Sequence, residues 1–258
     1  MNNFREIYNY REMLFSLVRR ELRGRYKGSV LGFLWTFINP LLQMLVYTVV
    51  FSAILKSGID KYYLFLFVVL IPWIFFSTSV IGSASCVVAQ KSLITKIYFP
   101  REILPLSYVT TCFVNMLLSF IVVFIIIFIS GVGFNIHALL YLPIVMIIEF
   151  FLTLGLSMLV AGITVYLRDI EHILNIVMMA WQFLTPIMYS VDVVPEKYKG
   201  LFQINPMTSI MIAYRDILYY KKLPQLNTLF MAVLFGAIVL VLGYVSFSKL
   251  KKGFAEEL

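Results

Sequence analysis

The stretch Leu106–Ser130, LSYVTTCFVNMLLSFIVVFIIIFIS, decides the fold class because it is long, apolar and free of charged residues. A helix needs about 20 consecutive apolar residues to cross a hydrocarbon layer of about 30 Å, and this stretch meets that length. Comparable runs occur elsewhere in the chain, at Leu31–Leu55, Tyr62–Val88, Ala138–Leu167, Ile173–Tyr189 and Thr228–Phe247. The sequence therefore predicts an all-α, polytopic membrane protein with six transmembrane helices.

Composition supports a single membrane domain. Hydrophobic residues make up 61% of the chain and charged residues 13%, against roughly 45–50% and about 25% in soluble domains. We expect an amphipathic segment over residues 1–30, a transmembrane domain over 31–249 and a tail over 250–258. Cys86 and Cys112 have no CxxC spacing and no metal-ligand neighbours, so we interpret them as packing residues and predict no metal site.

The basic residues indicate the orientation. The net charge of +8 is concentrated in the loops on one side, and an even number of spans puts both termini on that side. Short basic loops face the cytoplasm, so both termini are predicted to be cytoplasmic. In a membrane protein such charge favours contact with anionic lipids rather than nucleic acid.

The N-terminal segment Phe4–Tyr26 has the pattern of an interface helix. Its apolar side chains share one helical face, and its arginines lie largely off that face. A helix of this kind lies in the headgroup layer with its arginines on lipid phosphates. It could anchor the chain or dock a cytoplasmic partner, and the sequence leaves both open. The arginines that we assign to this role are Arg19, Arg20, Arg23 and Arg25.

Two connections are too elaborate for simple turns. The inner one, residues 90–105 (QKSLITKIYFPREILP), mixes basic, aliphatic and aromatic residues and predicts a short helix broken near Pro100 with an apolar contact surface. The outer one, residues 190–227, is too polar to span, yet Ile204–Tyr220 is apolar on much of its circumference. Irregular backbone at membrane depth must be shielded by protein or line water, so we predict short re-entrant helices that form a cap or gate.

Two polar stripes mark a candidate pathway. Thr36, Asn39, Gln43 and Tyr47 share one face of the first span because they are three or four residues apart. The fifth span has a similar set, which comprises Asn175, Trp181, Gln182, Thr185 and Tyr189. Intramembrane amides are costly unless they are paired or face water, so such stripes mark pathways or helix contacts. The residues alone leave both readings open.

Five blocks of sequence, in order, resemble the permease subunits of ABC transporters that export lipid-linked polysaccharides, the O-antigen and teichoic acid exporters. The resemblance covers essentially the whole chain. The blocks are Arg20–Leu42 (RELRGRYKGSVLGFLWTFINPLL), Lys96–Ser107 (KIYFPREILPLS), Tyr166–Leu174 (YLRDIEHIL), Thr185–Ser190 (TPIMYS) and Asn205–Tyr220 (NPMTSIMIAYRDILYY).

This resemblance implies a half-transporter of the bacterial cytoplasmic membrane that pairs as a homodimer and binds two ATPase subunits, which hold the ATP and Mg²⁺. It favours the pathway reading of the two stripes. The coupling helix of the family maps onto residues 90–105, with contacts assigned to Lys91, Ile94, Lys96, Tyr98, Phe99, Pro100, Arg101 and Glu102. Its outer gate maps onto residues 190–227, with Pro195, Asn205, Pro206 and Arg215.

The sequence is less consistent with other functions. A drug or small-lipid exporter of the same architecture is the alternative within transport. GxxxxGK[ST] is absent, so we do not expect the chain to hydrolyse ATP itself. An intramembrane enzyme, such as a protease or acyltransferase, is a further alternative, but HExxH and GxGD are absent too. A stand-alone channel or scaffold would give the interface helix and the 90–105 connection no role. Glu149 lies inside the fourth span; a neutral side chain, a pair across the dimer, a place near the outer interface and a proton relay all remain open. The sequence does not indicate which glycan is carried.

Overall fold

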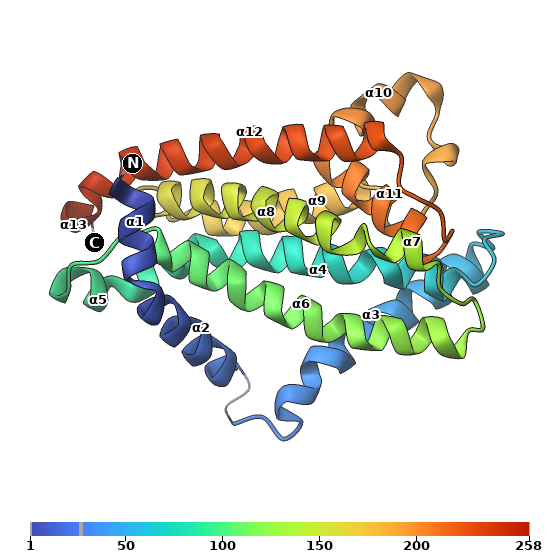
Figure 1. Cartoon of the computed structure of the whole chain (residues 1–258), viewed down its shortest axis with the longest axis horizontal. Helices are drawn as coiled ribbons and strands as arrows, with labels where there is room; N and C mark the ends of the chain where they lie inside the picture. Colours follow the sequence, from blue (N-terminus) through green and yellow to red (C-terminus); the bar gives the residue numbers. More distant parts are fainter. Residues whose placement is uncertain (1, 26–27, 258) are drawn as a thin grey trace.

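The computed structural model describes residues 2–25 and 28–257, and these residues form helices and connecting loops without a strand (Figure 1). Two short helices come first, and eleven follow. Their bounds are α1 Asn2–Asn9, α2 Arg11–Arg25, α3 Trp35–Thr48, α4 Tyr62–Cys86, α5 Lys91–Lys96, α6 Ile103–Ile129, α7 Ile136–Leu139, α8 Leu142–Thr164, α9 Ile170–Phe183, α10 Glu196–Ile204, α11 Pro206–Leu218, α12 Leu226–Leu250 and α13 Phe254–Glu257. A 3₁₀ turn, Gly32–Leu34, precedes α3, and a π-helical segment, Val49–Ile54, continues it.

Five helical segments of the described chain are long and apolar enough to cross a membrane. They are Gly32–Ile54, Tyr62–Cys86, Ile103–Ile129, Ile136–Thr164 and Leu226–Gly253. The predicted span Ile173–Tyr189 is replaced by α9, which has 14 residues and ends at Phe183. At 1.5 Å per residue α9 is shorter than the ~20 residues of a full crossing. The structure thus establishes an all-helical chain with five candidate spans.

Helix α4 is the centre of the bundle. It packs against α3, α6, α8, α9 and α11, and almost every side chain from Tyr62 to Phe76 is buried. Aromatic rings join the layers edge to face, with ring centroids 5.6 Å apart for Phe75 and Phe113 and 5.1 Å apart for Phe113 and Phe150. Such edge contacts are favourable because the positive ring edge meets the negative ring face.

Helices α8 and α12 make the closest backbone contact in the bundle. A Cβ atom on Gly155 would lie 2.6 Å from the Cα of Leu240, and one on Gly243 would collide with the carbonyl oxygen of Gly155. Only glycine permits this approach, which is how helices commonly pack in membranes, where small residues let backbones come together.

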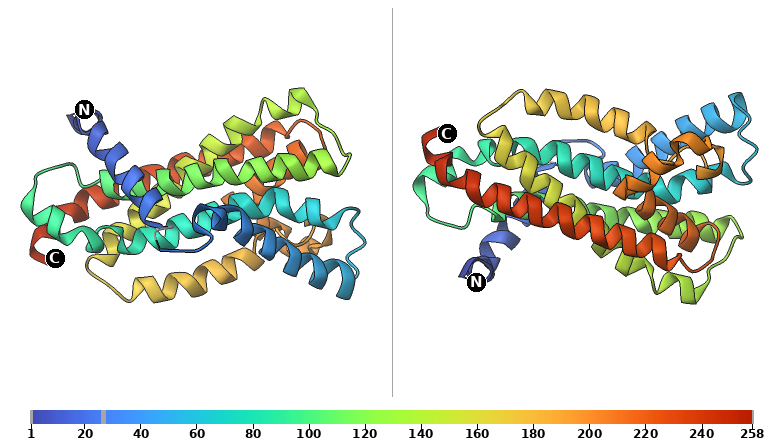
Figure 2. Two further views of the ribbon diagram at one scale, coloured as in Figure 1. Left: turned by 90° about the horizontal axis from the view of Figure 1, so that it is seen from below. Right: turned by 90° about the horizontal axis from the view of Figure 1, so that it is seen from above.

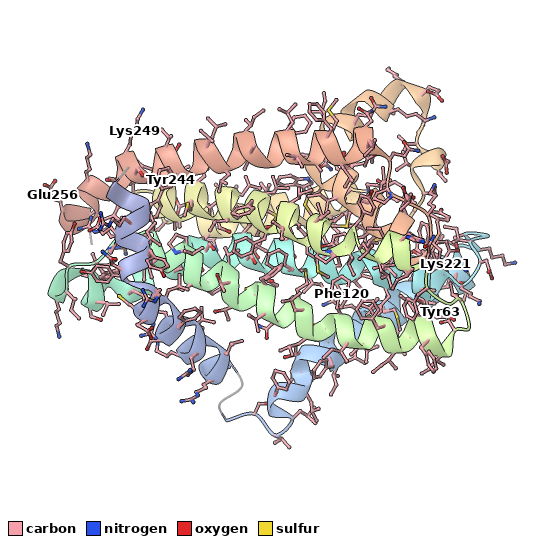
Figure 3. All side chains as sticks on the ribbon, viewed as in Figure 1. Tyr63, Phe120, Lys221, Tyr244, Lys249 and Glu256 are labelled. Atoms are coloured by element: carbon pink, nitrogen blue, oxygen red, sulfur yellow. The ribbon has the colours of Figure 1, made fainter. Side chains whose placement is uncertain are left out.

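The two ends of the bundle hold different elements of the chain. The termini, α5 and α13 lie at one end in all three views, whereas α7 and α10 lie at the other (Figures 1 and 2). Figure 3 shows Lys249 and Glu256 at the first end, and Tyr63 and Lys221 at the second. We call them the terminal end and the loop end.

Candidate functional site

The two predicted polar stripes meet at one point. Gln182 on α9 donates its amide N–H to the hydroxyl oxygen of Tyr47 on α3 at 3.3 Å, and Gln43 donates to Asn39 on the same helix at 3.4 Å. Gln43, Tyr47 and Gln182 are half-buried, and Asn39 and Asn175 are exposed. Thr36 is buried against α6, where its carbonyl accepts from Ser119. The pathway role of the stripes stays a prediction, but their convergence is a structural fact.

Around that point, α3 and α9 expose large apolar side chains. On α9 only Leu174 and Met178 are buried, and the exposed ones include Ile173, Ile176, Val177, Met179 and Phe183. On α3 and its π-helical extension the exposed set includes Leu42, Leu45, Val46 and Val49. A contiguous apolar surface on a membrane helix faces either lipid or another protein surface.

Asn205 connects the loop end of α9 to α11. Its side-chain oxygen accepts from the indole N–H of Trp181 and from the backbone N–H of Met207, both at 3.0 Å, so it also caps α11. Its amide N–H donates to Thr185 at 3.0 Å. Pro206 then occupies the first turn of α11, where its missing N–H costs nothing. Thr185, predicted to line the pathway, is fully buried in this network.

Arg215, another predicted gate residue, is buried and holds the irregular segment after α9. Its guanidinium donates to the carbonyl of Ile187 at 2.9 Å and to that of Tyr189 at 3.4 Å, and lies 3.7 Å from the centre of the Phe65 ring. Tyr62 fixes the same segment by donating to the carbonyl of Met188 at 2.8 Å. The predicted gate is therefore tied to the first turn of α4.

Tyr189, predicted to line the pathway, is half-buried and donates its hydroxyl to the carbonyl of Phe183 at 2.6 Å. The rest of the predicted gate is more exposed. Pro195 is exposed and stands immediately before α10, where its carbonyl accepts from the backbone N–H of Tyr198. Helix α10 is largely exposed, in contrast to α11, which packs against α4, α8 and α12.

Glu149 has a partner that sequence reasoning did not find. The carboxyl group is fully buried in α8, and Tyr214 of α11 donates its hydroxyl to one carboxyl oxygen at 2.6 Å. The other carboxyl oxygen has no hydrogen-bond partner among the described residues. The two residues are 65 positions apart, so no local spacing could indicate the pair.

At the terminal end, residues 90–105 form the predicted short helix, α5, followed by an extended stretch to Pro100. Ile94, Phe99, Pro100 and Glu102 are buried, whereas Lys91, Lys96, Ile97 and Tyr98 are exposed, with Tyr98 at 78%. The segment thus presents basic and apolar side chains outward while its other side packs on the bundle.

The two ends of the chain brace this segment. Tyr98 donates to the Glu6 carboxylate of α1 at 3.0 Å, a bond that raises the pKa of the Tyr98 hydroxyl, and its carbonyl accepts from Tyr10. Arg101 donates to the carbonyl of Lys251, and the Lys251 ammonium pairs with the buried Glu102. These contacts enclose a cleft of 510 Å³. Sequence reasoning missed the part that Lys251 plays in it.

The segment Phe4–Tyr26, predicted as one interface helix, forms two helices in its described part, α1 and α2. Helix α2 packs on α6, and its Leu17 is buried in the core. Arg19, Arg20 and Arg23 are exposed, which fits the predicted contact with headgroups; the side chain of Arg25 lies outside the described residues.

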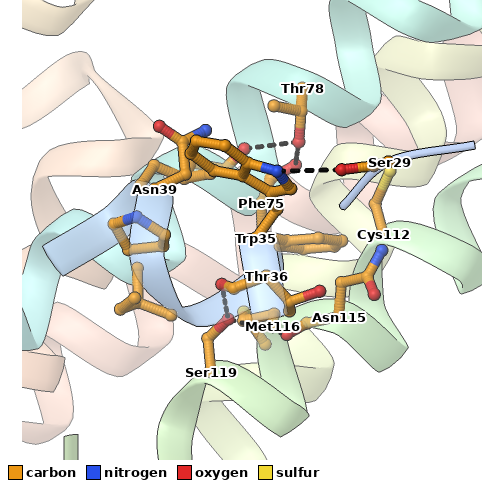
Figure 4. Close-up of a pocket in the computed structure, with 13 residues that line it drawn as sticks. Ser29, Trp35, Thr36, Asn39, Phe75, Thr78, Cys112, Asn115, Met116 and Ser119 are labelled. Carbon is orange, nitrogen blue, oxygen red and sulfur yellow. Dashed lines mark hydrogen bonds between the residues drawn. The ribbon is translucent and has the colours of Figure 1, made fainter. Parts of the chain in front are cut away.

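A pocket of 430 Å³ lies between the start of α3 and the middles of α4 and α6 (Figure 4). Asn39, Asn115, Thr78, Trp35 and Phe75 line it together with small and aliphatic side chains. The indole N–H of Trp35 donates to the hydroxyl oxygen of Ser29 at 3.1 Å and Thr78 donates to the carbonyl of Ile74 at 2.6 Å.

The comparison with protein families decides what kind of protein this is. The model of the ABC-2 type transporter family matches residues 12–219, most of the chain. The chain belongs to the ABC-2 type transporter family. It is similar, at 38% identity over 256 residues covering 98% of both chains, to the O-antigen export system permease protein RfbA of Myxococcus xanthus. It is 31% identical to the protein of the same name from Klebsiella pneumoniae, over 95% of this chain and 94% of that one.

A more distant ABC-2 relative is the polysialic acid transport protein KpsM of Escherichia coli, 21% identical over 88% of this chain and 89% of that one. The family confirms the resemblance found in the five sequence blocks. As an ABC-2 type permease, the chain is a multi-pass subunit of a membrane transporter. Among the described residues no group of three or more His, Cys, Asp or Glu side chains could hold a metal ion.

Proposed function

We propose that this permease exports a lipid-linked polysaccharide of the O-antigen type across the bacterial cytoplasmic membrane, driven by separate ATPase subunits. The names of the relatives at 38% and 31% identity over nearly the full chain support the polysaccharide and do not favour the drug-export alternative. The observation in the structure that carries the proposal is the pair of polar, aromatic-flanked faces of α3 and α9, which meet at Gln182 and Tyr47.

The channel would form between two copies of the chain. Helices α3 and α9 leave apolar surface uncovered, so a second copy packed against them would bury it and enclose the polar stripes. Amide groups would then bond to sugar hydroxyls, and aromatic rings would contact the C–H faces of the sugars. The sixth crossing would consist of α9 and the irregular segment that Arg215 and Tyr62 hold after it.

The ATPase subunits would dock at the terminal end, on the exposed face of α5 and residues 97–98. ATP and Mg²⁺ would be held by those subunits. Because Arg101 and Glu102 bind Lys251, which directly follows α12, a push on α5 would reach both α6 and α12. Both termini would then lie in the cytoplasm, with Arg19, Arg20 and Arg23 of α2 on anionic headgroups.

The test is complementation. A strain that lacks its own permease would receive this chain with its cognate ATPase, and surface polysaccharide would be measured by antibody binding to intact cells. We expect export with the active ATPase and none when the Walker lysine of the ATPase is replaced. Export without a working ATPase would contradict the proposal, as would an intact complex that restores no surface polysaccharide.

A further inference from the structure

The pocket between α3, α4 and α6 contains a buried amide that has no partner. Asn115 is only 8% exposed and lines the pocket, and neither its amide nitrogen nor its amide oxygen has a hydrogen-bond partner among the described residues (Figure 4). Leaving a buried polar group unpaired costs roughly 1–3 kcal/mol, so a packing role alone does not explain why an amide is placed here.

The pocket has the size and lining of a small-molecule site. Its 430 Å³ lies within the 300–1,000 Å³ or so that is typical of such sites, which are mostly apolar with a few placed polar groups. The rings of Trp35 and Phe75 supply flat apolar faces, and Asn39 stands opposite as a second amide. Asn39 also belongs to the predicted pathway stripe of α3, so the pocket opens beside that pathway.

We propose that this pocket binds one neutral sugar ring of the transported glycan, an inference that rests on the proposed function. Adjacent hydroxyls of a sugar can donate to Oδ1 and accept from Nδ2 of Asn115 while the ring carbons lie against Trp35 and Phe75. An acyl chain would leave both amide atoms unpaired. None of the described residues that line the pocket is charged, so none of them would offset the desolvation of an anionic group.

The site would act as a holding point for a sugar unit beside the channel. It is built from three helices, so its shape depends on how α3 packs against α4 and α6. Binding of a sugar there would favour the arrangement in which α3 stays against the other two helices.

The test uses the full-length chain, purified in a detergent without a sugar headgroup, and saturation-transfer NMR with N-acetylglucosamine and methyl glucoside as neutral probes. We expect both probes to bind, glucuronic acid to bind more weakly, and Asn115→Leu to reduce neutral-sugar affinity at least about tenfold. Asn39→Leu, at the exposed rim, should reduce it about threefold without touching the core. Thr153→Val, which alters an unpaired buried hydroxyl away from this pocket, is the control and should bind like the unaltered chain.

Equal binding by the Asn115→Leu, Asn39→Leu and unaltered chains would overturn the inference, and so would equal binding of the charged and neutral sugars or none of either. If the chain exports polysaccharide but replacing Asn115 does not change sugar binding, only the proposed sugar site is contradicted. If sugar binding requires Asn115 but the chain exports no polysaccharide, the proposed function fails instead.

Discussion

Helix α4 and the pair α3 and α9 are all rich in apolar residues but opposite in burial. In the most apolar 18-residue window of Tyr62–Cys86, 78% of the residues are buried inside the chain, whereas in the corresponding window of Gly32–Ile54 only 6% are. α4 owes its burial to five neighbouring helices from the same chain, and α3 and α9 have far fewer. This difference indicates that α4 supports the fold, whereas α3 and α9 each keep a face available for lipid or another protein surface.

The largest expected effect is on the stability of the helix bundle. Gly243→Ala puts a Cβ into the backbone of α8 at Gly155, and overpacking of this kind costs about 3 kcal/mol or more where a backbone must move. Gly200→Ala on α10 is the matched control, since a Cβ there meets nothing within 4 Å. Thermal unfolding in detergent, followed by size-exclusion chromatography, should show a much lower midpoint for Gly243→Ala only. Equal midpoints would show that the two helices can separate freely.

The next effect concerns the link between α8 of the bundle and α11, which belongs to the predicted gate. Tyr214→Phe removes the donor to the buried Glu149, and the unpaired carboxyl should cost about 1–3 kcal/mol of stability. Tyr198→Phe on exposed α10 should cost nothing measurable. Adding Glu149→Leu to Tyr214→Phe should restore part of the loss, because both polar partners are then gone. A double variant that loses the full sum of the single effects would mean that the pair does not interact.

The same contrast shows what the sequence could and could not indicate. Apolar runs and charge-free lengths predicted the long helices, and the four-residue spacing of Asn39, Gln43 and Tyr47 predicted their shared face. The few hydroxyl side chains of α4 do not form a separate polar face, so its sequence does not say which neighbour each residue contacts.

The missed contacts are long-range ones. Glu149 with Tyr214 and Glu102 with Lys251 join positions 65 and 149 residues apart, and they depend on how each helix is rotated in the bundle. The length of α9 was overestimated for a related reason. The apolar run continues past Phe183, but the polypeptide turns there because Asn205 and Arg215 bind the backbone and side chains that follow.

A smaller effect on stability, with a larger one on transport, is expected at the meeting point of the stripes. Gln182→Leu removes the bond to Tyr47, which is worth about 0.6–2 kcal/mol in a membrane, and the chain should still fold and assemble. Polysaccharide export should fall by about tenfold if the amide lines the pathway. Gln43→Leu should behave alike, and Met179→Leu on the exposed side of α9 should leave export unchanged. Loss of assembly in place of loss of export would assign the stripes to helix packing.

The smallest effect on the fold is expected at the exposed surface of residues 90–105, where we propose that the ATPase subunit docks. Ile97 is 55% exposed beside α5, so Ile97→Asp should change stability by no more than about 0.5 kcal/mol. The matched control is Val193→Asp at the loop end, where the side chain is 73% exposed. If the ATPase docks on residues 90–105, a carboxylate in that apolar contact must be desolvated without a partner, which weakens the complex.

Co-purification of the ATPase and ATP-dependent export measure the outcome together. We expect Ile97→Asp to lose both while the chain keeps its unaltered melting midpoint, and Val193→Asp to keep both. Because folding is unaffected in either variant, the difference can arise only from what lies against each surface. Retention of the ATPase by Ile97→Asp would move the docking surface elsewhere, and the basic side chains of Lys91 and Lys96 would then be the next to replace. Loss of the ATPase in both variants would show that any added carboxylate weakens the complex, wherever it lies on the surface. The terminal end would then not be the docking surface that its exposed side chains suggest.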